Sequence, residues 1–233
     1  MREVVLDTET TGLSPREGHR IVEIGGVELI NQVPTGEVYH QYINPQRDMP
    51  QEAFNVHGLS EEFLRGHPTF EEIAPAFCEF VDGAVLVIHN APFDMAFINA
   101  ELDWTKRPAI PEEQVLDTLA MARRKHPMGP NSLDALCRRY DVDNSNRTKH
   151  GALLDAELLA AVYLELIGGR QRGLDISTSE AQSSQNTVRR KSAAMPRPVP
   201  LAERVTSTER EAHAKMLKGL GDSPLWSQYS VPN

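Results

Sequence analysis

The sequence has little of what several protein classes require. Its 233 residues include only two cysteines, Cys78 and Cys137, which lie far apart in apolar or helix-like surroundings. They provide neither a disulfide framework nor a paired zinc site, so we interpret them as reduced packing residues. No apolar run approaches the roughly 18 residues of a membrane-spanning helix, and the start does not resemble a secretory signal. We therefore expect an intracellular, cytoplasmic protein without membrane contact.

The sequence also has fewer basic than acidic residues, and its charge is unevenly distributed along the chain. Residues 1–168 hold 27 acidic and 14 basic side chains, a net charge of −13, whereas residues 169–233 hold 6 acidic and 10 basic ones, a net charge of +4. Hydrophobic residues make up 40% of the whole chain and charged residues 24%, which is typical of a globular protein. The change of sign near Gly168 indicates two parts with different tasks.

The second part has almost no aromatic residues. No Phe, Trp or Tyr occurs between Tyr163 and Trp226. A segment of this composition cannot bury enough apolar surface to offset the entropy of ordering it, so we predict a flexible tether over residues 169–203. Within residues 204–233, two capping-box patterns, at Thr206 and at Thr208, and apolar residues at helical spacing predict a short amphipathic helix. That helix docks either into a groove of a partner protein or back onto the first part.

Hydrophobic periodicity divides residues 1–168 into strands and helices. A meander of strands comes first, followed by alternating helices and strands, which indicates an α/β domain with a mixed sheet. The expected strands cover residues 4–9, 20–31, 38–45 and 85–90, with a turn at 33–36, and the expected helices cover residues 71–81, 94–102, 132–140 and 153–167.

Two acids stand at the end of the first apolar strand. Because strand residues two apart face the same side, Asp7 and Glu9 present their carboxylates together. Crowding like charges raises the pKa of a carboxyl group or demands a cation, and a hard divalent ion with oxygen ligands is the simplest choice. The alternative is a strand that ends there with both acids in water.

Polar residues also follow the apolar strand at residues 85–90. His89 and Asn90 stand at its carboxyl end, where ligands collect in open α/β sheets, and Asp94 begins the next helix. Taken alone, Asp94 is better explained as an ordinary first-turn acid that complements the helix dipole.

A third motif contains His150 and Asp155, which are five residues apart. On one regular helix they would point about 140° apart. Gly151 allows His150 to lie on the loop before the helix while Asp155 points inward from its first turns. His150 then reaches the same spot from outside, and the alternative is an ordinary surface histidine.

Together, Asp7, Glu9, Asp94 and Asp155 form an all-oxygen ligand set that suits Mg²⁺ or Mn²⁺ rather than zinc. With His150 they complete three motifs, Asp-x-Glu, Asn-x-x-Phe-Asp and His-x-x-x-x-Asp. In these motifs, residues 1–168 closely resemble the DEDDh 3′→5′ exonucleases of the ribonuclease H-like superfamily. The resemblance implies a ribonuclease H-like mixed sheet flanked by helices, and hydrolysis of DNA 3′ ends to nucleoside 5′-monophosphates.

The same resemblance implies roles for individual residues. It places two divalent metal ions, Mg²⁺ or Mn²⁺, between Asp7, Glu9, Asp94 and Asp155, with His150 as the general base that deprotonates the attacking water. The residues implied to surround the terminal nucleotide are Asp7, Glu9, Thr10, His57, Leu59, His89, Asn90, Phe93 and Asp155.

Further segments resemble one family within that superfamily, the epsilon proofreading subunits of bacterial DNA polymerase III. These segments are the His57-Gly58 pair and residues 131–140 and 143–155. Members of this family carry a flexible tail that binds the polymerase (alpha) subunit. By resemblance, residues 204–233 are expected to bind that subunit.

The tether contains a second peptide motif at residues 171–176. Gln171, Leu174 and Ile176 resemble a sliding-clamp-binding peptide of the form Gln-x-x-Leu-x-hydrophobic, so contact with the sliding clamp is expected there. Nothing in the sequence decides whether a small theta-like subunit binds.

A net charge of −13 is unusual for a DNA enzyme, because phosphates attract Lys and Arg. Bound metal ions reverse part of the acidic field. Basic residues at 123–125, 138–139, 147 and 149 either border a groove or form solvated helix faces.

Two other functions fit parts of the sequence. A freestanding DEDDh exoribonuclease would use the same catalytic residues but would not need the tail. A non-catalytic scaffold would use the tail but would not need the catalytic residues.

Overall fold

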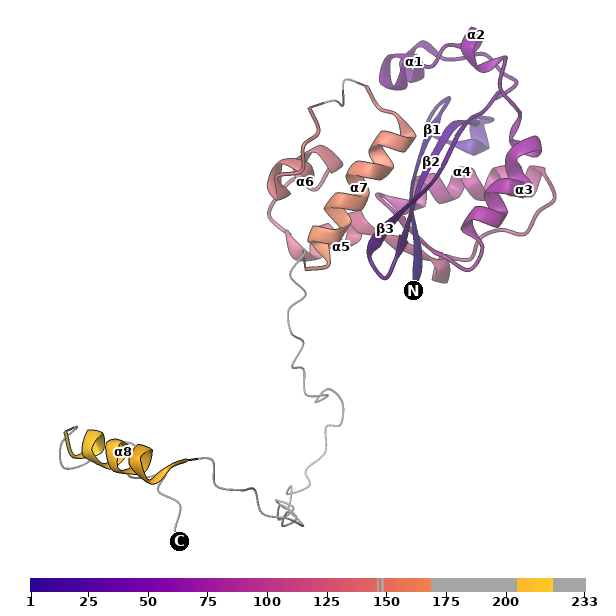
Figure 1. Cartoon of the computed structure of the whole chain (residues 1–233). Helices are drawn as coiled ribbons and strands as arrows, with labels where there is room; N and C mark the ends of the chain where they lie inside the picture. Colours follow the sequence, from indigo (N-terminus) through magenta and orange to yellow (C-terminus); the bar gives the residue numbers. More distant parts are fainter. Residues whose placement is uncertain (146, 148, 169–204, 220–233) are drawn as a thin grey trace, which may run out of the picture. The chain divides into compact units, whose positions relative to one another are not determined.

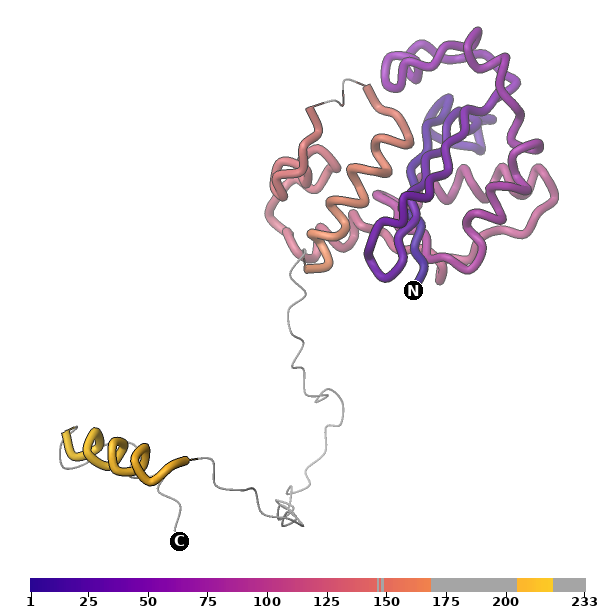
Figure 2. The backbone as a smooth tube through the Cα atoms, viewed as in Figure 1, coloured from indigo at the N-terminus to yellow at the C-terminus, as the bar shows by residue number. Residues whose placement is uncertain are grey.

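In the described residues, 1–145, 147, 149–168 and 205–219, one mixed sheet contains five strands, β1 (Arg2–Thr10), β2 (Ile21–Ile30), β3 (Val33–Tyr42), β4 (Val85–Ile88) and β5 (Val115–Asp117). The computed structural model orders them β3-β2-β1-β4-β5. β1, β2 and β3 form an antiparallel meander, whose indigo-to-purple trace is continuous in Figure 2, and β4 and β5 add parallel to β1. The predicted mixed sheet is confirmed.

The helices of the chain are α1 (Gln51–His57), α2 (Glu61–Leu64), α3 (Phe70–Val81), α4 (Ala91–Trp104), α5 (Thr118–Lys125), α6 (Leu133–Tyr140), α7 (Ala152–Leu166) and α8 (Ser207–Gly219), with short 3₁₀ turns η1 (Pro15–Glu17) and η2 (Glu112–Gln114). In Figure 1, α3 and α4 cover one face of the sheet and α7 covers the other, with α5 and α6 beside it. α1 and α2 lie over the end of β1. None of the helices in the described ranges combines the length and apolar character needed to cross a bilayer.

The two faces of β1 belong to different cores. Val4 and Leu6 are fully buried with the aromatic side chains of α3 and α4, whereas Val5 is buried with Leu159 and Tyr163 of α7. This alternation follows from the two-residue period of a strand. By the same period Thr8 lies on the α4 side of β1, whereas Asp7 and Glu9 lie on the α7 side.

The hairpin between β2 and β3 differs from the expectation. The prediction of a turn at residues 33–36 is wrong, because these residues lie inside β3. The chain reverses two residues earlier, at Asn31 and Gln32, which both have positive φ angles of 51° and 67°. Such angles at both central residues are typical of the tight turns that fit the strand twist. Pro34, a common turn residue, is tolerated in β3 because β3 is an edge strand.

A glycine brings α7 close to the sheet. Gly25 pairs with Asp7 in the register of β1 and β2, and a Cβ atom added to it would lie 2.3 Å from the backbone carbonyl carbon of Ala152. Only glycine permits this approach. Because Ala152 begins α7, the contact places Asp155, in the first turn of the helix, against the same side of β1 as Asp7.

The chain divides into two units, residues 1–177 and 178–233. In the second unit, α8 opens with the first of the two predicted capping boxes: the backbone and hydroxyl groups of Thr206 both donate to the Glu209 carboxylate, at 2.8 and 2.9 Å. Every residue of α8 is at least partly exposed. The predicted tether at 169–203 and the predicted clamp-binding peptide at 171–176 lie outside the described residues, as do residues 204 and 220–233 of the predicted polymerase-binding segment.

Candidate active site

An open cleft of about 1100 Å³ lies at the carboxyl ends of β1 and β4. Its walls come from the end of β1, from the residues that follow β4, from α1, and from the starts of α4 and α7. Among the residues that the sequence predicts for the site, Leu59 does not line the cleft formed by the described residues. The expected residues that do line the cleft are Asp7, Glu9, Thr10, His57, His89, Asn90, Phe93, Asp94, His150 and Asp155.

β1 supplies the two carboxylates predicted to act together. Burial, reinforced by the charges of Asp94, Glu9 and Asp155, raises the pKa of Asp7 well above its usual value. Burial and the nearby Asp155 carboxylate likewise raise the pKa of Glu9 to about 8. Negative charge is therefore crowded at this end of β1, and a bound cation relieves it.

Asp94 enters the cleft from the first turn of α4. The helix begins after Asn90, which adopts a left-handed conformation with φ of 67°, and Pro92 occupies one of its first positions. The Thr8 hydroxyl donates a 2.7 Å hydrogen bond to Asp94 Oδ1 and fixes the carboxylate. Burial raises the pKa of Asp94 to about 7, although the bond from Thr8 opposes the shift.

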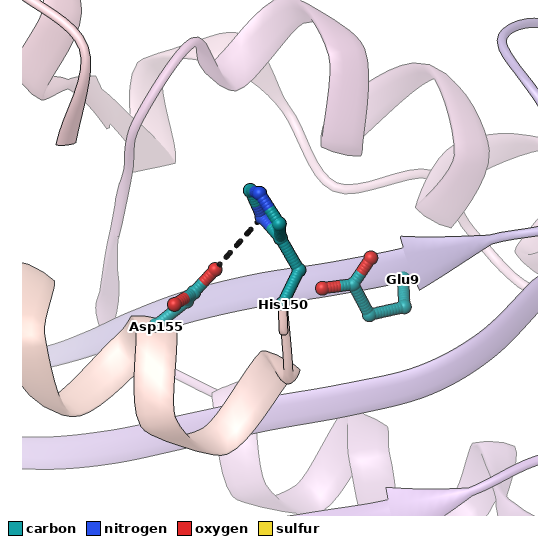
Figure 3. A group of neighbouring side chains, drawn as sticks. All are labelled: Glu9, His150 and Asp155. Carbon is teal, nitrogen blue, oxygen red and sulfur yellow. Dashed lines mark ion pairs between the residues drawn. The ribbon is translucent and has the colours of Figure 1, made fainter. Parts of the chain in front are cut away.

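His150 and Asp155 meet as the sequence predicts. Gly151 separates them as the residue preceding α7, and Asp155 is 3% exposed in the first turn of the helix. His150 Nδ1 lies 3.3 Å from Asp155 Oδ2, and Figure 3 shows the imidazole above the Asp155 carboxylate with Glu9 on the strand beside them. One ligand atom from each of Glu9, His150 and Asp155 falls within 4.8 Å of the other two.

Arg147 contacts Asp155 and His150 directly, which the sequence does not predict. Its guanidinium donates from Nε to Asp155 Oδ1 at 2.5 Å and from Nη2 to Asp155 Oδ2 at 2.6 Å. It also donates from Nη1 to Asp134 Oδ1 at 2.9 Å and from Nη2 to His150 Nδ1 at 2.7 Å. Arg147 lines the cleft, in agreement with the expected groove edge, whereas the alternative of a solvated position is wrong, because its side chain is only 8% exposed.

This arginine acts on several acids of the site: its charge opposes the raised pKa values of Asp7 and Glu9, and at Asp155 it helps to reverse the direction of the shift. Burial raises the pKa of Asp155, but the hydrogen bonds and charge of Arg147, together with the neighbouring His150, outweigh burial, and the pKa falls below its usual value. The pKa of Arg147 is raised, first by the hydrogen bond to Asp155. The signal in the sequence was a single basic residue three positions before the histidine motif.

Two further histidines line the cleft as neutral rings. Burial lowers the pKa of His57 to about 4, and its Nδ1 accepts a 3.0 Å hydrogen bond from the backbone N–H of Leu59. Leu59 therefore orients a cleft residue without lining the cleft itself. Burial also lowers the pKa of His89, whose Nδ1 lies 2.9 Å from the Thr118 hydroxyl. Near neutral pH both rings offer hydrogen bonds rather than charge.

The site therefore joins crowded carboxylates to one exposed imidazole. Oxygen-rich clusters of this kind bind hard divalent cations, and an imidazole accepts protons near neutral pH. The arrangement is suited to hydrolysis assisted by metal ions.

Comparison with known proteins agrees with this chemistry. Residues 4–163 match the family described as Exonuclease (RNase_T). The chain is 57% identical over 174 residues to the DNA polymerase III subunit epsilon of Rickettsia conorii, covering 73% of this chain and 76% of that protein. It is 45% identical over 237 residues to the subunit of the same name from Escherichia coli K12, covering 97% of both chains.

Solved structures share the fold. Exonuclease X, solved in complex with 5′ overhanging duplex DNA, is 26% identical with a TM-score of 0.56, covering 70% of this chain and 90% of that one. The nuclease domain of 3′hExo, a DEDDh family member bound to rAMP, has a TM-score of 0.62 at 17% identity, covering 73% and 94%. The chain therefore belongs to the DNA polymerase III epsilon family of exonucleases.

Proposed function

We propose that this chain is the proofreading 3′→5′ exodeoxyribonuclease of a replicative DNA polymerase III. It hydrolyses the 3′-terminal phosphodiester of DNA and releases nucleoside 5′-monophosphates. The observation that carries the proposal is the meeting of Glu9, His150 and Asp155 within 4.8 Å, in a cleft that Asp7 and Asp94 also line. Epsilon relatives that match along 97% of the chain support it.

Two divalent ions, Mg²⁺ or Mn²⁺, fit the residues present. The ligands we assign to them are Asp7, Glu9, Asp94 and Asp155, since three of these acids have raised pKa values that bound cations would bring down. When bound, such ions polarise the phosphate, lower the pKa of the attacking water and stabilise the leaving oxygen.

The side chains of the protein hold and move the remaining groups. His150 accepts the proton of the attacking water, because its half-exposed imidazole lies beside Asp155. Thr8 keeps Asp94 oriented through its 2.7 Å hydrogen bond. The terminal nucleotide is bound by Asp7, Glu9, Thr10, His57, His89, Asn90, Phe93 and Asp155. Leu59 orients His57 through the hydrogen bond that its backbone N–H donates to the imidazole.

The partners we propose follow from the tail. Residues 204–233, which include α8, bind the polymerase (alpha) subunit, and an exposed amphipathic helix is suited to a groove on another protein. The segment 169–203 is the tether, and residues 171–176 contact the sliding clamp. The complex works in the cytoplasm at the replication fork.

The test is digestion of a 5′-labelled DNA primer, paired or mispaired at its 3′ end, with Mg²⁺ present. Wild type and Asp155→Ala are compared, with and without a co-expressed polymerase subunit. Stepwise shortening that requires Asp155, favours the mispair and increases with the polymerase is expected. Preference for single-stranded RNA would instead indicate a freestanding exoribonuclease, and inactivity in every lane would indicate a scaffold.

A further inference from the structure

Arg147 forms hydrogen bonds with two side chains that the proposed reaction needs, Asp155 and His150. Both oxygens of the Asp155 carboxylate accept hydrogen bonds from its guanidinium, at 2.5 and 2.6 Å. Its Nη2 also donates to Nδ1 of His150 at 2.7 Å. A single buried cation therefore engages the carboxylate assigned to metal binding and the ring assigned to proton transfer.

The contact with His150 restricts that ring. Arginine has only donors, so the Nδ1 atom that receives its N–H must be the unprotonated nitrogen of the imidazole. In a neutral ring Nε2 then carries the proton. The one lone pair of the ring able to take a proton from water is thus directed at Arg147, and His150 becomes free to act only when this bond is broken.

The contact with Asp155 competes with metal binding in a similar way. A guanidinium carries a full positive charge and a rigid fork that matches a carboxylate. A divalent ion bound to the same carboxylate would stand within a few ångströms of that charge, in a partly buried site where repulsion between cations is weakly screened. The two cations therefore do not share Asp155 without cost.

Arg147 also has a second acceptor at the edge of the cleft. Its Nη1 donates to Asp134 Oδ1 at 2.9 Å, and the Asp134 side chain is 43% exposed. The Asn144 side-chain amide donates to the same oxygen at 3.1 Å. Asp134 can retain the arginine after Asp155 is released, so the guanidinium needs to move only from the inner carboxylate toward the outer one.

We propose that Arg147 is an internal counter-cation that holds Asp155 and His150 in an inactive arrangement and is displaced from Asp155 when divalent metal binds. Arg147 is therefore a positioning residue that sets the metal affinity of the site and makes release of the general base depend on metal loading. The proposal rests on the proposed function, because it takes Asp155 as a metal ligand and His150 as the base.

The test measures metal binding itself. Mn²⁺ is titrated into the full-length chain by isothermal calorimetry, for wild type, Arg147→Gln and the matched control Arg138→Gln, which removes the same charge from an exposed position on α6. Removing the competing charge is expected to tighten Mn²⁺ binding about tenfold or more in Arg147→Gln. Arg138→Gln is expected to bind as wild type does. The unfolding temperature of Arg147→Gln in EDTA should fall, because Asp155 loses its partner.

Unchanged or weaker Mn²⁺ binding in a folded Arg147→Gln chain would overturn the proposal. If that variant does not fold, Asp134→Asn decides the question. Removing the outer carboxylate should weaken Mn²⁺ binding, because the displaced guanidinium loses the charged acceptor toward which it moves, and unchanged or tighter binding there overturns the proposal as well. Absence of Mn²⁺ binding in wild type is a separate outcome, since it contradicts the metal assignment of the proposed function.

Discussion

Lys149 Nζ lies 5.1 Å from the centre of the Phe54 ring, so the loop before α7 is attached to α1. Next to this contact, the backbone N–H of His150 donates a 3.3 Å hydrogen bond to the carbonyl of Val56. Gly58 ends α1 in a left-handed conformation, with φ of 77°, and the Lys149 side chain packs directly over it. The wall formed by α1 therefore positions the proposed general base.

Replacing Phe54 by alanine tests this attachment. The variant should lower the single-turnover rate on a DNA primer about three- to tenfold, which is the size expected from losing one cation–π contact. Mn²⁺ affinity should stay as in wild type, because no proposed metal ligand is touched. Phe63→Ala, at an exposed phenylalanine of α2, is the matched control. Full activity of Phe54→Ala would show that the backbone bond alone positions His150.

Replacing Asp7 by asparagine should separate function from stability. Activity is expected to fall about a thousandfold or more, since a catalytic metal contributes several kcal/mol to the transition state. In EDTA, however, the unfolding temperature should rise, because one of the crowded negative charges is removed. Asp103→Asn, at an exposed acid of α4, should change neither quantity. A lower unfolding temperature for Asp7→Asn would contradict the claim that crowded negative charges at the end of β1 destabilise the metal-free protein.

Much of this site could be predicted from local sequence because its geometry is local. The two-residue period of a strand places Asp7 and Glu9 on one side of β1, and Gly151 separates His150 from the helix that carries Asp155. Both relationships depend on backbone geometry over a few residues. The expected fold class is confirmed for the same reason, since β1, α3, α4 and α7 have clear apolar patterns.

Other features depend on tertiary contacts or are too short to have a pattern. α1, α2 and β5 have 7, 4 and 3 residues, less than the periodicity of a helix or strand needs to become visible. Arg147 contacts acids 8 and 13 residues away through the conformation of a loop. A basic residue in a polar loop is expected to be exposed to solvent. The burial of the Arg147 guanidinium could therefore not be predicted from the residues beside it in the sequence.

Replacing His150 by alanine distinguishes a base from a ligand. Activity should fall about a hundred- to ten-thousandfold, as for loss of a general base. Mn²⁺ binding by calorimetry should stay within a few-fold of wild type, because four carboxylates remain. His213→Ala, at an exposed position of α8, is the control when polymerase is absent. Loss of Mn²⁺ binding in His150→Ala would make the imidazole a metal ligand, as its 4.8 Å grouping with Glu9 and Asp155 also permits.

The raised pKa values predict how stability in EDTA depends on pH. Glu9 and Asp94 keep their protons up to about pH 8 and about pH 7 in the folded protein, whereas in the unfolded chain they lose them near pH 4. Between these values the folded state binds more protons, so the free energy of unfolding falls as the pH rises. Asp155 has a lowered pKa, and its opposite contribution is lost only at acidic pH, as the pH falls through its folded pKa.

Urea denaturation in EDTA at about pH 5.5 and about pH 8 measures this slope. Wild type should be more stable at the lower pH, and Glu9→Gln should flatten the difference because glutamine does not titrate. Adding Mg²⁺ should stabilise wild type more at the higher pH, since the ligands must be deprotonated to bind it. Equal stability of wild type at both pH values in EDTA would mean that the acids of β1 and α4 are ionised in the folded protein without a metal and do not destabilise it. The electrostatic reason for assigning metal ions to these acids would then be lost.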